Sequence, residues 1–359
     1  MSDVGPSPSR RLYFVSPTVD GALVGGVSLA ACVLLAATLG HAPLALPFVL
    51  PWVCNWPHFA ATSYRLYHSR DNVRQYPMTA FAVPVVVLAG MAWAFAAPDA
   101  VAPVFVKAML LWSPYHFSGQ TLGIALGYTR RAGCTVSRAE RLALAAFVFG
   151  SYLSGTAHIE TGTGVRQYLG VSHPKLGLEP WVAPAVDVAV GAAALALVIL
   201  LLLRARRAER ALPAIALLPV AAQCVWFVLG RGVDSFQALV PAFHSVQYLF
   251  VAWVVQLKER MTQEELAPSP RYVVYETLRW WTVNVALGLL LFLGFPYACS
   301  VFGYEVPFAM AVTSAAVQIH HFFVDGVIWK LRNPHVRSPL LATAAECWGP
   351  PADALREAA

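Results

Sequence analysis

The run VAPAVDVAVGAAALALVILLLL, residues Val182–Leu203, decides the fold class, because 22 almost wholly apolar residues stand directly before Arg204. An α-helix rises 1.5 Å per residue, so about 20 apolar residues cross the ~30 Å hydrocarbon core of a bilayer. Similar runs recur along the 359-residue chain, which is 58% hydrophobic and only 12% charged. Soluble domains carry about 25% charged residues. The sequence therefore predicts an all-α, polytopic integral membrane bundle.

About ten transmembrane helices are expected. They lie at 21–39, 44–66, 78–98, 102–128, 141–160, 180–203, 212–230, 236–256, 279–299 and 305–329. The first is too long for the apolar core of a signal peptide, so we expect it to remain as a helix. The chain then divides into an N-terminal segment (1–20), a transmembrane helical domain (21–330) and a C-terminal tail (331–359).

The distribution of Lys and Arg predicts the orientation. These residues gather before the first span and after every even-numbered span, for example at Arg130, Arg206 and Lys258. The loops after spans one, three and nine have none. Because cytoplasmic loops carry an excess of positive charge, both termini are expected in the cytoplasm. We expect a multi-pass protein of the cell membrane, of the bacterial inner-membrane type.

Charge and cysteine content exclude several other classes. The formal net charge of +6 lies in short loops between apolar runs, so it gives no reason to expect a nucleic-acid partner. The six cysteines form no CxxC pair, and most lie inside apolar runs. Neither a zinc knuckle nor a disulfide framework is therefore expected.

Five of the ten histidines lie inside predicted spans, where ionisable side chains are costly and mark functional sites. They are His58, His116, His244, His320 and His321. Counted from the estimated span starts, all but His244 lie 14–16 residues below the outer boundary, a depth of about 21–24 Å. His244 counts as 8 residues deep, unless its span begins earlier. This shared depth predicts a layer of imidazoles that binds metal.

Polar side chains stand three or four residues from these histidines, and therefore on the same helix face. The pairs are Asn55 with His58, Gln120 with His116, Gln247 with His244, and Asp325 with His321. Metal-bound histidines usually donate their second N–H to such groups. Asp325 and Gln120 are therefore the candidate catalytic residues. Two alternatives stay open: the amides can hydrogen-bond between helices, and Asp325 can pair with Lys330 or Arg332.

The pair His320-His321 is similar to the histidine pairs in the His boxes of membrane di-iron desaturases and hydroxylases. The spacings HxxxH and HxxHH, which complete those boxes, do not occur in the chain. Four histidines on a helical membrane scaffold are also similar in outline to the membrane carotenoid-cleaving dioxygenases, although no local motif carries that resemblance. The resemblance in each case implies iron held by histidine.

Three functions remain open. The first is a metal-dependent oxidoreductase with non-haem iron, held by the five histidines, which acts as a desaturase, hydroxylase or oxygenase. Its substrate would be a lipophilic molecule taken from membrane lipid, and an electron-donor protein is a possible partner. The second is a haem b protein that transfers electrons. The third is a transporter or proton-coupled carrier, in which the histidines and Asp325 form a relay.

Several other polar residues give weaker signals. His158 and Glu160 lie near the outer end of the fifth span, where a hydrated helix end is the simplest interpretation and a second metal or proton site the alternative. Lys107 can extend toward the outer surface. Asp187 is a single acid within the sixth span and is expected to pair with another helix or to belong to an ion path.

Overall fold

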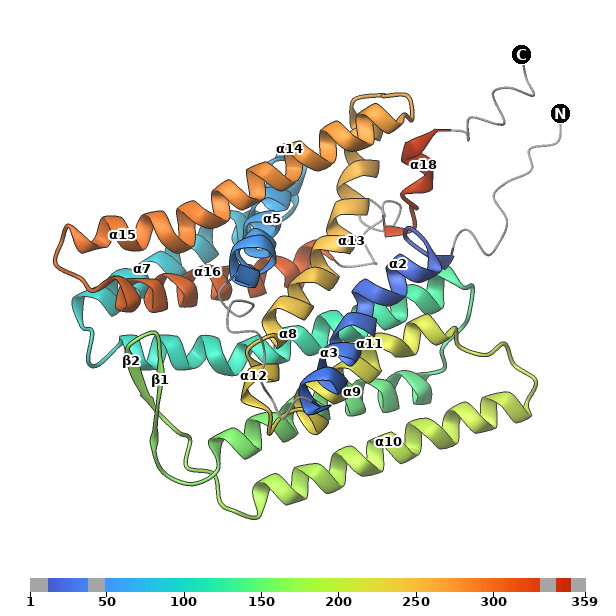
Figure 1. Cartoon of the computed structure of the whole chain (residues 1–359), viewed down its shortest axis with the longest axis horizontal. Coiled ribbons are helices and arrows are strands. Elements are labelled where there is room, and N and C mark those ends of the chain that lie inside the picture. Colours follow the sequence, from blue (N-terminus) through green and yellow to red (C-terminus); the bar gives the residue numbers. More distant parts are fainter. Residues whose placement is uncertain (1–11, 38–48, 330–339, 350–359) are drawn as a thin grey trace.

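The structure is a computed structural model that describes residues 12–37, 49–329 and 340–349. Parts of the predicted N-terminal segment, of the second span and of the C-terminal tail lie outside these residues, as do Lys330 and Arg332. The described chain forms a bundle of helices with one short antiparallel hairpin (Figure 1). The all-α prediction is confirmed at this level.

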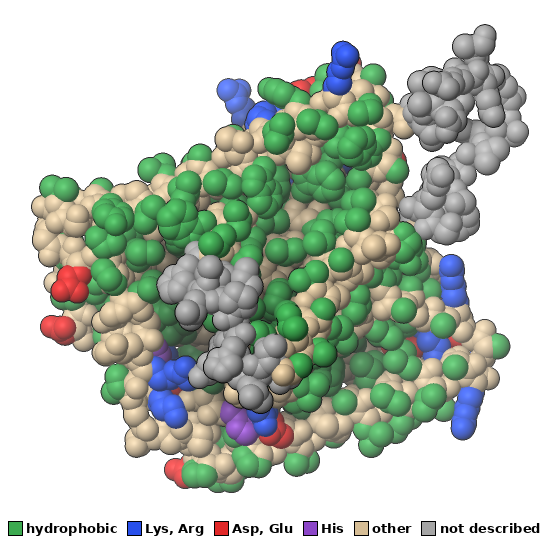
Figure 2. Space-filling view, viewed as in Figure 1, with side chains coloured by type: hydrophobic (Ala, Val, Ile, Leu, Met, Phe, Trp, Pro, Cys, Tyr) green, Lys and Arg blue, Asp and Glu red, His purple; other side chains and the backbone are tan. Residues whose placement is uncertain are grey.

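Seven helical segments are long and apolar enough to cross a membrane within the described ranges. They are Pro17–Leu35, Met78–Ala96, Arg138–Glu160, Val182–Arg206, Val240–Gln263, Pro270–Ser300 and Val306–Ile328. Hydrophobic side chains are spread over the whole face seen in Figure 2, whereas charged side chains are few. The chain is therefore a multi-pass membrane protein, and the membrane in which it resides stays a prediction.

The other three predicted spans are also helical where they are described, but they do not belong to this set. The second contains the π-helical turn η2 (Pro51–Asn55) and the short α5 (Trp56–Tyr67). The fourth is α8 (Ala102–Arg131), which has 30 residues but is polar in its middle. The seventh, α11 (Ala214–Cys224) with η4 (Val225–Leu229), is shorter. The total of ten spans therefore stays a prediction.

The remaining elements complete the bundle. They are α2 (Pro17–Gly21), η1 (Ala22–Gly26), α3 (Val27–Ala37), α6 (Arg70–Gln75), η3 (Met78–Ala82), α7 (Val83–Ala96), α9 (Arg138–Glu160), β1 (Val165–Tyr168), β2 (Val171–Pro174), α10 (Val182–Arg206), α12 (Asp234–Gln237), α13 (Val240–Gln263), α14 (Pro270–Leu289), η5 (Leu290–Gly294), α15 (Phe295–Ser300), α16 (Val306–Ile328) and α18 (Ala345–Trp348). The π-helical turns continue into α-helices, as η1 does into α3. Such turns leave some carbonyl groups free for other partners.

The bundle has two distinct ends (Figure 1). The hairpin β1–β2 lies at one, which we call the hairpin end, and the described segments nearest both termini lie at the other, the terminal end. Helices α8 and α10 both finish at the terminal end, and each carries arginines in its last turn. This agrees with the alternation of charge along the sequence. Which end faces the cytoplasm stays a prediction.

Burial separates central from peripheral helices. In α13, 78% of the most apolar window is buried, whereas in α10 the buried share is only 11%. Helix α10 therefore presents its apolar surface to lipid, and it lies along the edge of the bundle in Figure 1. In the interior, α16 packs against α5 and α8, and α13 packs against α5. These four helices carry the polar site.

A glycine brings α14 close to the start of α5. A Cβ atom built on Gly288 would lie 2.9 Å from the backbone carbon of Trp56, closer than real Cβ contacts. Displacing helix backbone costs more free energy than moving a flexible side chain. Any residue larger than glycine would therefore push the two helices apart. His58 stands two residues after Trp56, so this contact helps to set its position.

A buried carboxylate fixes the start of the first span. Asp20 is fully buried and accepts hydrogen bonds from the backbone N–H groups of Phe14 (2.7 Å), Val15 (2.9 Å) and Ser16 (3.1 Å). It also accepts the hydroxyl of Tyr128 on α8 (2.7 Å). A buried carboxylate is tolerated when it is hydrogen-bonded in this way. The arrangement holds the segment around Phe14 against the last turns of α8.

Candidate metal centre

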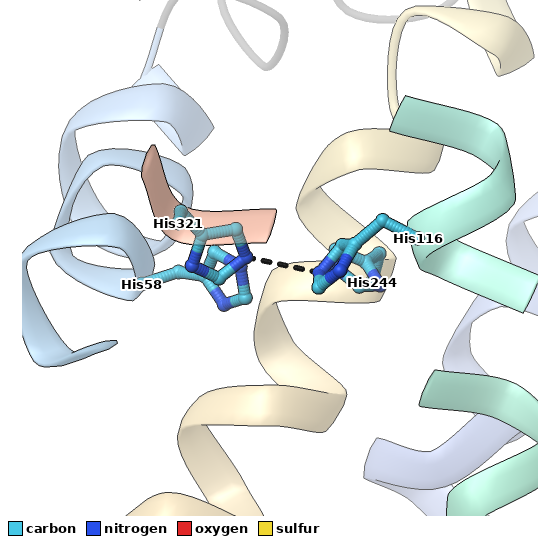
Figure 3. A group of neighbouring side chains, drawn as sticks. All are labelled: His58, His116, His244 and His321. Carbon is cyan, nitrogen blue, oxygen red and sulfur yellow. Dashed lines mark hydrogen bonds between the residues drawn. The ribbon is translucent and has the colours of Figure 1, made fainter. Parts of the chain in front are cut away.

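Four histidines from four helices converge in the middle of the bundle. His58 comes from α5, His116 from α8, His244 from α13 and His321 from α16, and their rings point toward one another (Figure 3). Each side chain offers one ring nitrogen as a ligand atom, and these four nitrogens all lie within 4.8 Å of one another. We call these four side chains the histidine group. His58, His244 and His321 are at most 1% exposed.

The shortest approaches in the group join Nε2 atoms. His321 Nε2 lies 3.0 Å from His58 Nε2 and 2.9 Å from His116 Nε2. The ring of His244 completes the group, with its centroid 5.0 Å from that of His58 and 5.1 Å from that of His116. A neutral imidazole has one N–H donor and one acceptor lone pair. His321 Nε2 cannot make a satisfactory hydrogen bond to both neighbours at once.

Several ring nitrogens of the group have no hydrogen-bond partner. Both nitrogens of His244 and Nδ1 of His58 are buried and unpartnered among the described residues. A buried polar atom without a partner costs about 1–3 kcal/mol, so such atoms are rare and call for a physical reason. Convergent, buried, neutral nitrogen donors are what a transition-metal ion requires of its ligands. The side chains that are present therefore fit a metal ion.

Thr62 orients the ring of His321. Its Oγ1 lies 2.9 Å from His321 Nδ1, and its hydroxyl is within hydrogen-bond distance of Tyr248 Oη (2.5 Å) and Asp325 Oδ1 (3.2 Å). If Nδ1 carries the proton and donates it to Thr62, the lone pair of Nε2 points into the group. A hydrogen bond of this kind determines which nitrogen of a metal-binding histidine is free.

Asp325 lies directly beside the histidine group. Its Oδ2 is 3.6 Å from His321 Nε2 and 3.7 Å from His116 Nε2. Its Oδ1 accepts the indole N–H of Trp329 (3.2 Å) and lies 3.3 Å from Tyr248 Oη. The alternative that Asp325 pairs with Lys330 or Arg332 involves residues outside the described ranges. Within those ranges, the contacts of Asp325 join it to the histidines.

Two of the amide neighbours, Gln120 and Gln247, are hydrogen-bonded to each other. Gln120 donates from Nε2 to the carbonyl of His244 (3.0 Å) and to Oε1 of Gln247 (3.3 Å). Gln247 in turn donates to the carbonyl of Val24, which lies in the π-helical turn η1. Asn55 is farther away and accepts a hydrogen bond from Ser245 (2.9 Å). Gln120 therefore bonds to the backbone of α13 at His244 and so positions that helix, rather than an imidazole ring.

His320 is not brought into the histidine group. Its ring stacks on Tyr67, with centroids 6.2 Å apart, and its Nε2 lies 3.4 Å from the hydroxyl of Tyr67. The physical reason is helical geometry, since consecutive residues point about 100° apart around the axis. With His321 directed into the bundle, His320 is directed away. The prediction that His320 belongs with the other four metal-binding histidines is therefore corrected, and His320 is left out of the proposed site.

The polar residues near the hairpin end form ion pairs instead. His158 Nε2 lies 2.9 Å from Asp187, which also accepts Ser154 Oγ (2.5 Å) and both terminal nitrogens of Arg231 (3.0 and 3.1 Å). We call these four residues the hairpin-end cluster. Every member has a partner, so the cluster serves as a link between α9, α10 and the chain after η4.

Lys107 and Glu160 form a separate buried pair. Lys107 Nζ lies 2.5 Å from Glu160 Oε2, and the two residues are 8% and 4% exposed. The expectation that Lys107 extends to the surface is therefore wrong, because a buried carboxylate one helix away provides a closer partner. Glu160 also accepts the backbone N–H of Leu176, which follows the hairpin (2.8 Å).

Sequence reasoning missed Thr62, Tyr248 and Trp329. A signal for two of them existed, because Thr62 stands four residues after His58 and Tyr248 four after His244. Residues at that spacing share a helix face. The same spacing indicated Gln120 and Asp325, and it applies equally to hydroxyl groups. Trp329, four after Asp325, could have been found in the same way.

Comparison with protein-family models, with curated proteins and with solved structures found no match. The function must therefore be argued from the histidine group and its surroundings.

Proposed function

We propose that the histidine group binds one metal ion and that the protein is a metal-dependent membrane oxidoreductase. The observation that carries the proposal is the convergence of four imidazoles, three of them buried, with ligand atoms within 4.8 Å; two of the four have unpartnered ring nitrogens. A structural histidine would instead have its hydrogen bonds satisfied by the surrounding helices. A metal ion accepts a lone pair from each ring and removes the cost of the orphaned atoms.

Non-haem iron is the metal that we propose. Neutral imidazoles suit iron, copper and zinc, and the absence of a cysteine from the group disfavours sites that depend on thiolate. Bound iron would supply one-electron and dioxygen chemistry. A lipophilic substrate fits a site that lies among membrane-spanning helices. Desaturation, hydroxylation and oxygenation are the reactions that this combination allows.

The protein's own groups would orient the ligands and handle a proton. Thr62 would keep the proton of His321 on Nδ1 and its Nε2 lone pair directed inward. Asp325 would balance part of the positive charge, since its carboxylate lies within 4 Å of two ligand atoms. It also lines the cavity beside the group, so it stands where a proton would pass between substrate and site. An electron-donor protein would complete an oxidoreductase of this kind.

The histidine geometry favours a bare metal ion over haem b. Two axial histidines face each other across a flat macrocycle, which needs a wide open slot between them. Here the other two imidazoles stand in that space, because all four ligand atoms lie within 4.8 Å of one another. A haem would have to displace both.

The alternative of a proton-coupled carrier makes an opposite prediction about metal. A relay of histidines and Asp325 would work with no stoichiometric ion. The orphaned nitrogens of His244 count against it, because a relay member needs a partner to which a proton can pass.

Metal content and an absorption spectrum of the detergent-purified full-length chain test the proposal. The expected result is about one iron per chain, as four convergent nitrogen donors imply, without the intense Soret band of a haem. A Soret band would establish the haem protein. Protein that is folded and active in transport but free of transition metal would establish the carrier.

A further inference from the structure

A cavity of about 390 Å³ begins at the histidine group and extends toward the terminal end. It meets the group at His116 and Asp325 and has Arg130 at its other extreme. Ligand sites in proteins usually have volumes of this order. The cavity is lined on α8 by Trp112, Tyr115, His116, Gly119, Gln120, Gly123, Ile124, Gly127 and Arg130.

The shape of the cavity follows from the face of α8 that lines it. His116 and Arg130 are 14 residues apart, which is about 21 Å along a helix. The cavity therefore extends along α8 over at least this length, and hydrophobic side chains such as Trp112, Ile124 and Val251 line it.

Three glycines leave part of the cavity wall without side chains. Gly119 and Gly123 on α8 and Gly326 on α16 line the cavity and are exposed. A Cβ atom at any of them would meet nothing within 4 Å. These positions of α8 and α16 therefore leave room for a ligand beside the helix backbone.

The polar groups at the two extremes differ in kind. At the inner end, Oε1 of Gln120 is buried without a partner among the described residues, beside His116. At the terminal end, Arg130 is exposed and has no ion pair with any described residue. Its neighbour Arg131 is fully engaged, with hydrogen bonds to four carbonyl groups and its guanidinium 4.2 Å above the ring of Phe14. The guanidinium of Arg130 can thus pair with one negative charge.

We propose that this cavity binds a long-chain fatty carboxylate. Its carboxylate pairs with Arg130, since a guanidinium matches a carboxylate with two parallel hydrogen bonds. Its chain lies along Gly127, Gly123 and Gly119, with its far carbons at His116. Its role as the substrate rests on the proposed metal site, whereas its binding does not.

Two glycine substitutions test the location of the bound chain. Gly123→Phe fills the cavity with a ring, while Gly191→Phe places the same ring on the lipid-facing side of α10, and neither Cβ meets another atom within 4 Å. We expect full-length protein in lipid nanodiscs to bind radiolabelled palmitate saturably. Gly123→Phe should weaken this binding at least about tenfold, and Gly191→Phe should leave it unchanged. Equal binding by both variants would overturn the proposal.

Arg130→Gln tests the charged end. Palmitate binding should fall about tenfold, whereas binding of hexadecanol, which has the same chain and no charge, should not change. An equal effect on both ligands, or tighter binding of hexadecyl phosphate than of palmitate, would contradict the pairing of one arginine with one carboxylate. His244→Ala protein should still bind palmitate, so a failure of the metal proposal is separated from a failure of this one.

Discussion

The histidine group and the hairpin-end cluster both contain ionisable side chains within the helical bundle, but they differ in how those side chains are satisfied. Around Asp187 every charged or polar neighbour has a partner of opposite charge or a hydrogen bond. In the histidine group four like side chains face one another, and both nitrogens of His244 lack a partner among the described residues. A cluster whose polar atoms all have partners within the cluster contributes to stability. A cluster whose buried polar atoms lack such partners indicates a site for a ligand.

The largest effect on metal affinity is expected from His244→Ala. The side chain of His244 makes no hydrogen bond to the described residues, so its removal breaks none and takes away one of four ligands. It does leave a buried cavity, so thermal unfolding of the variant is measured beside its metal content. Metal content after purification should fall by well over the 10–100-fold that removal of an orienting residue produces.

His320→Ala is the matched control, because His320 is adjacent to His321 yet directed toward Tyr67. It should retain the wild-type metal content. Loss of metal from this variant, with retention in His244→Ala, would reverse the assignment: His320 would be a ligand and His244 would not.

A smaller loss is expected from Asp325→Asn. The substitution keeps the shape of the side chain and removes the charge that lies within 4 Å of two ligand nitrogens. Metal affinity should fall about 10–100-fold, measured by competition with a chelator. Asp187→Asn removes a carboxylate from the hairpin-end cluster and should leave metal affinity as it is. Equal affinities in all three proteins would remove Asp325 from the site.

Thr62→Val should give an effect of the same kind as Asp325→Asn but at the lower end of the range. Valine has nearly the shape of threonine, so packing is kept and the hydroxyl that orients His321 Nδ1 is lost. We expect about a tenfold loss of metal affinity. A Thr62→Ser variant, which retains the hydroxyl, should recover most of it, and failure of that recovery would point to packing instead.

Lys107→Met should have no effect on metal affinity and a large effect on stability. The change leaves Glu160 buried without its cation, and breaking a buried pair in this way costs about 3–5 kcal/mol. Thermal unfolding in detergent should show the loss, and Lys107→Met combined with Glu160→Gln should recover part of it. A fall in metal content at unchanged stability would mean that this pair, too, belongs to the site.

The sequence was sufficient for the fold class and for naming four histidines that converge, for identifiable reasons. In a chain so poor in charge, an apolar run of about 20 residues has few structures open to it other than a membrane-spanning helix. The helices could be placed for this reason. Counting residues from span starts placed His58, His116 and His321 at one level, and these three side chains converge in the structure.

The same count underestimated the depth of His244. Helix α13 begins at Val240, only four residues before it. The chain is already buried ahead of that point, since Phe236 in α12 and Leu239 are 0% and 5% exposed. Depth counted from a helix start fails where the chain enters the bundle before the helix begins. The direction of His320 likewise depends on the rotation of α16, which packing determines and a span boundary does not.

X-ray absorption at the iron edge of purified full-length protein tests metal binding by the histidine group most directly. We expect a coordination shell dominated by imidazole nitrogens at about 2.0–2.2 Å. The outer-shell scattering of histidine rings should accompany it, and this pattern should be lost in His244→Ala and kept in His320→Ala. A shell of sulfur ligands, a porphyrin pattern, or a spectrum unchanged by His244→Ala would contradict the proposed site.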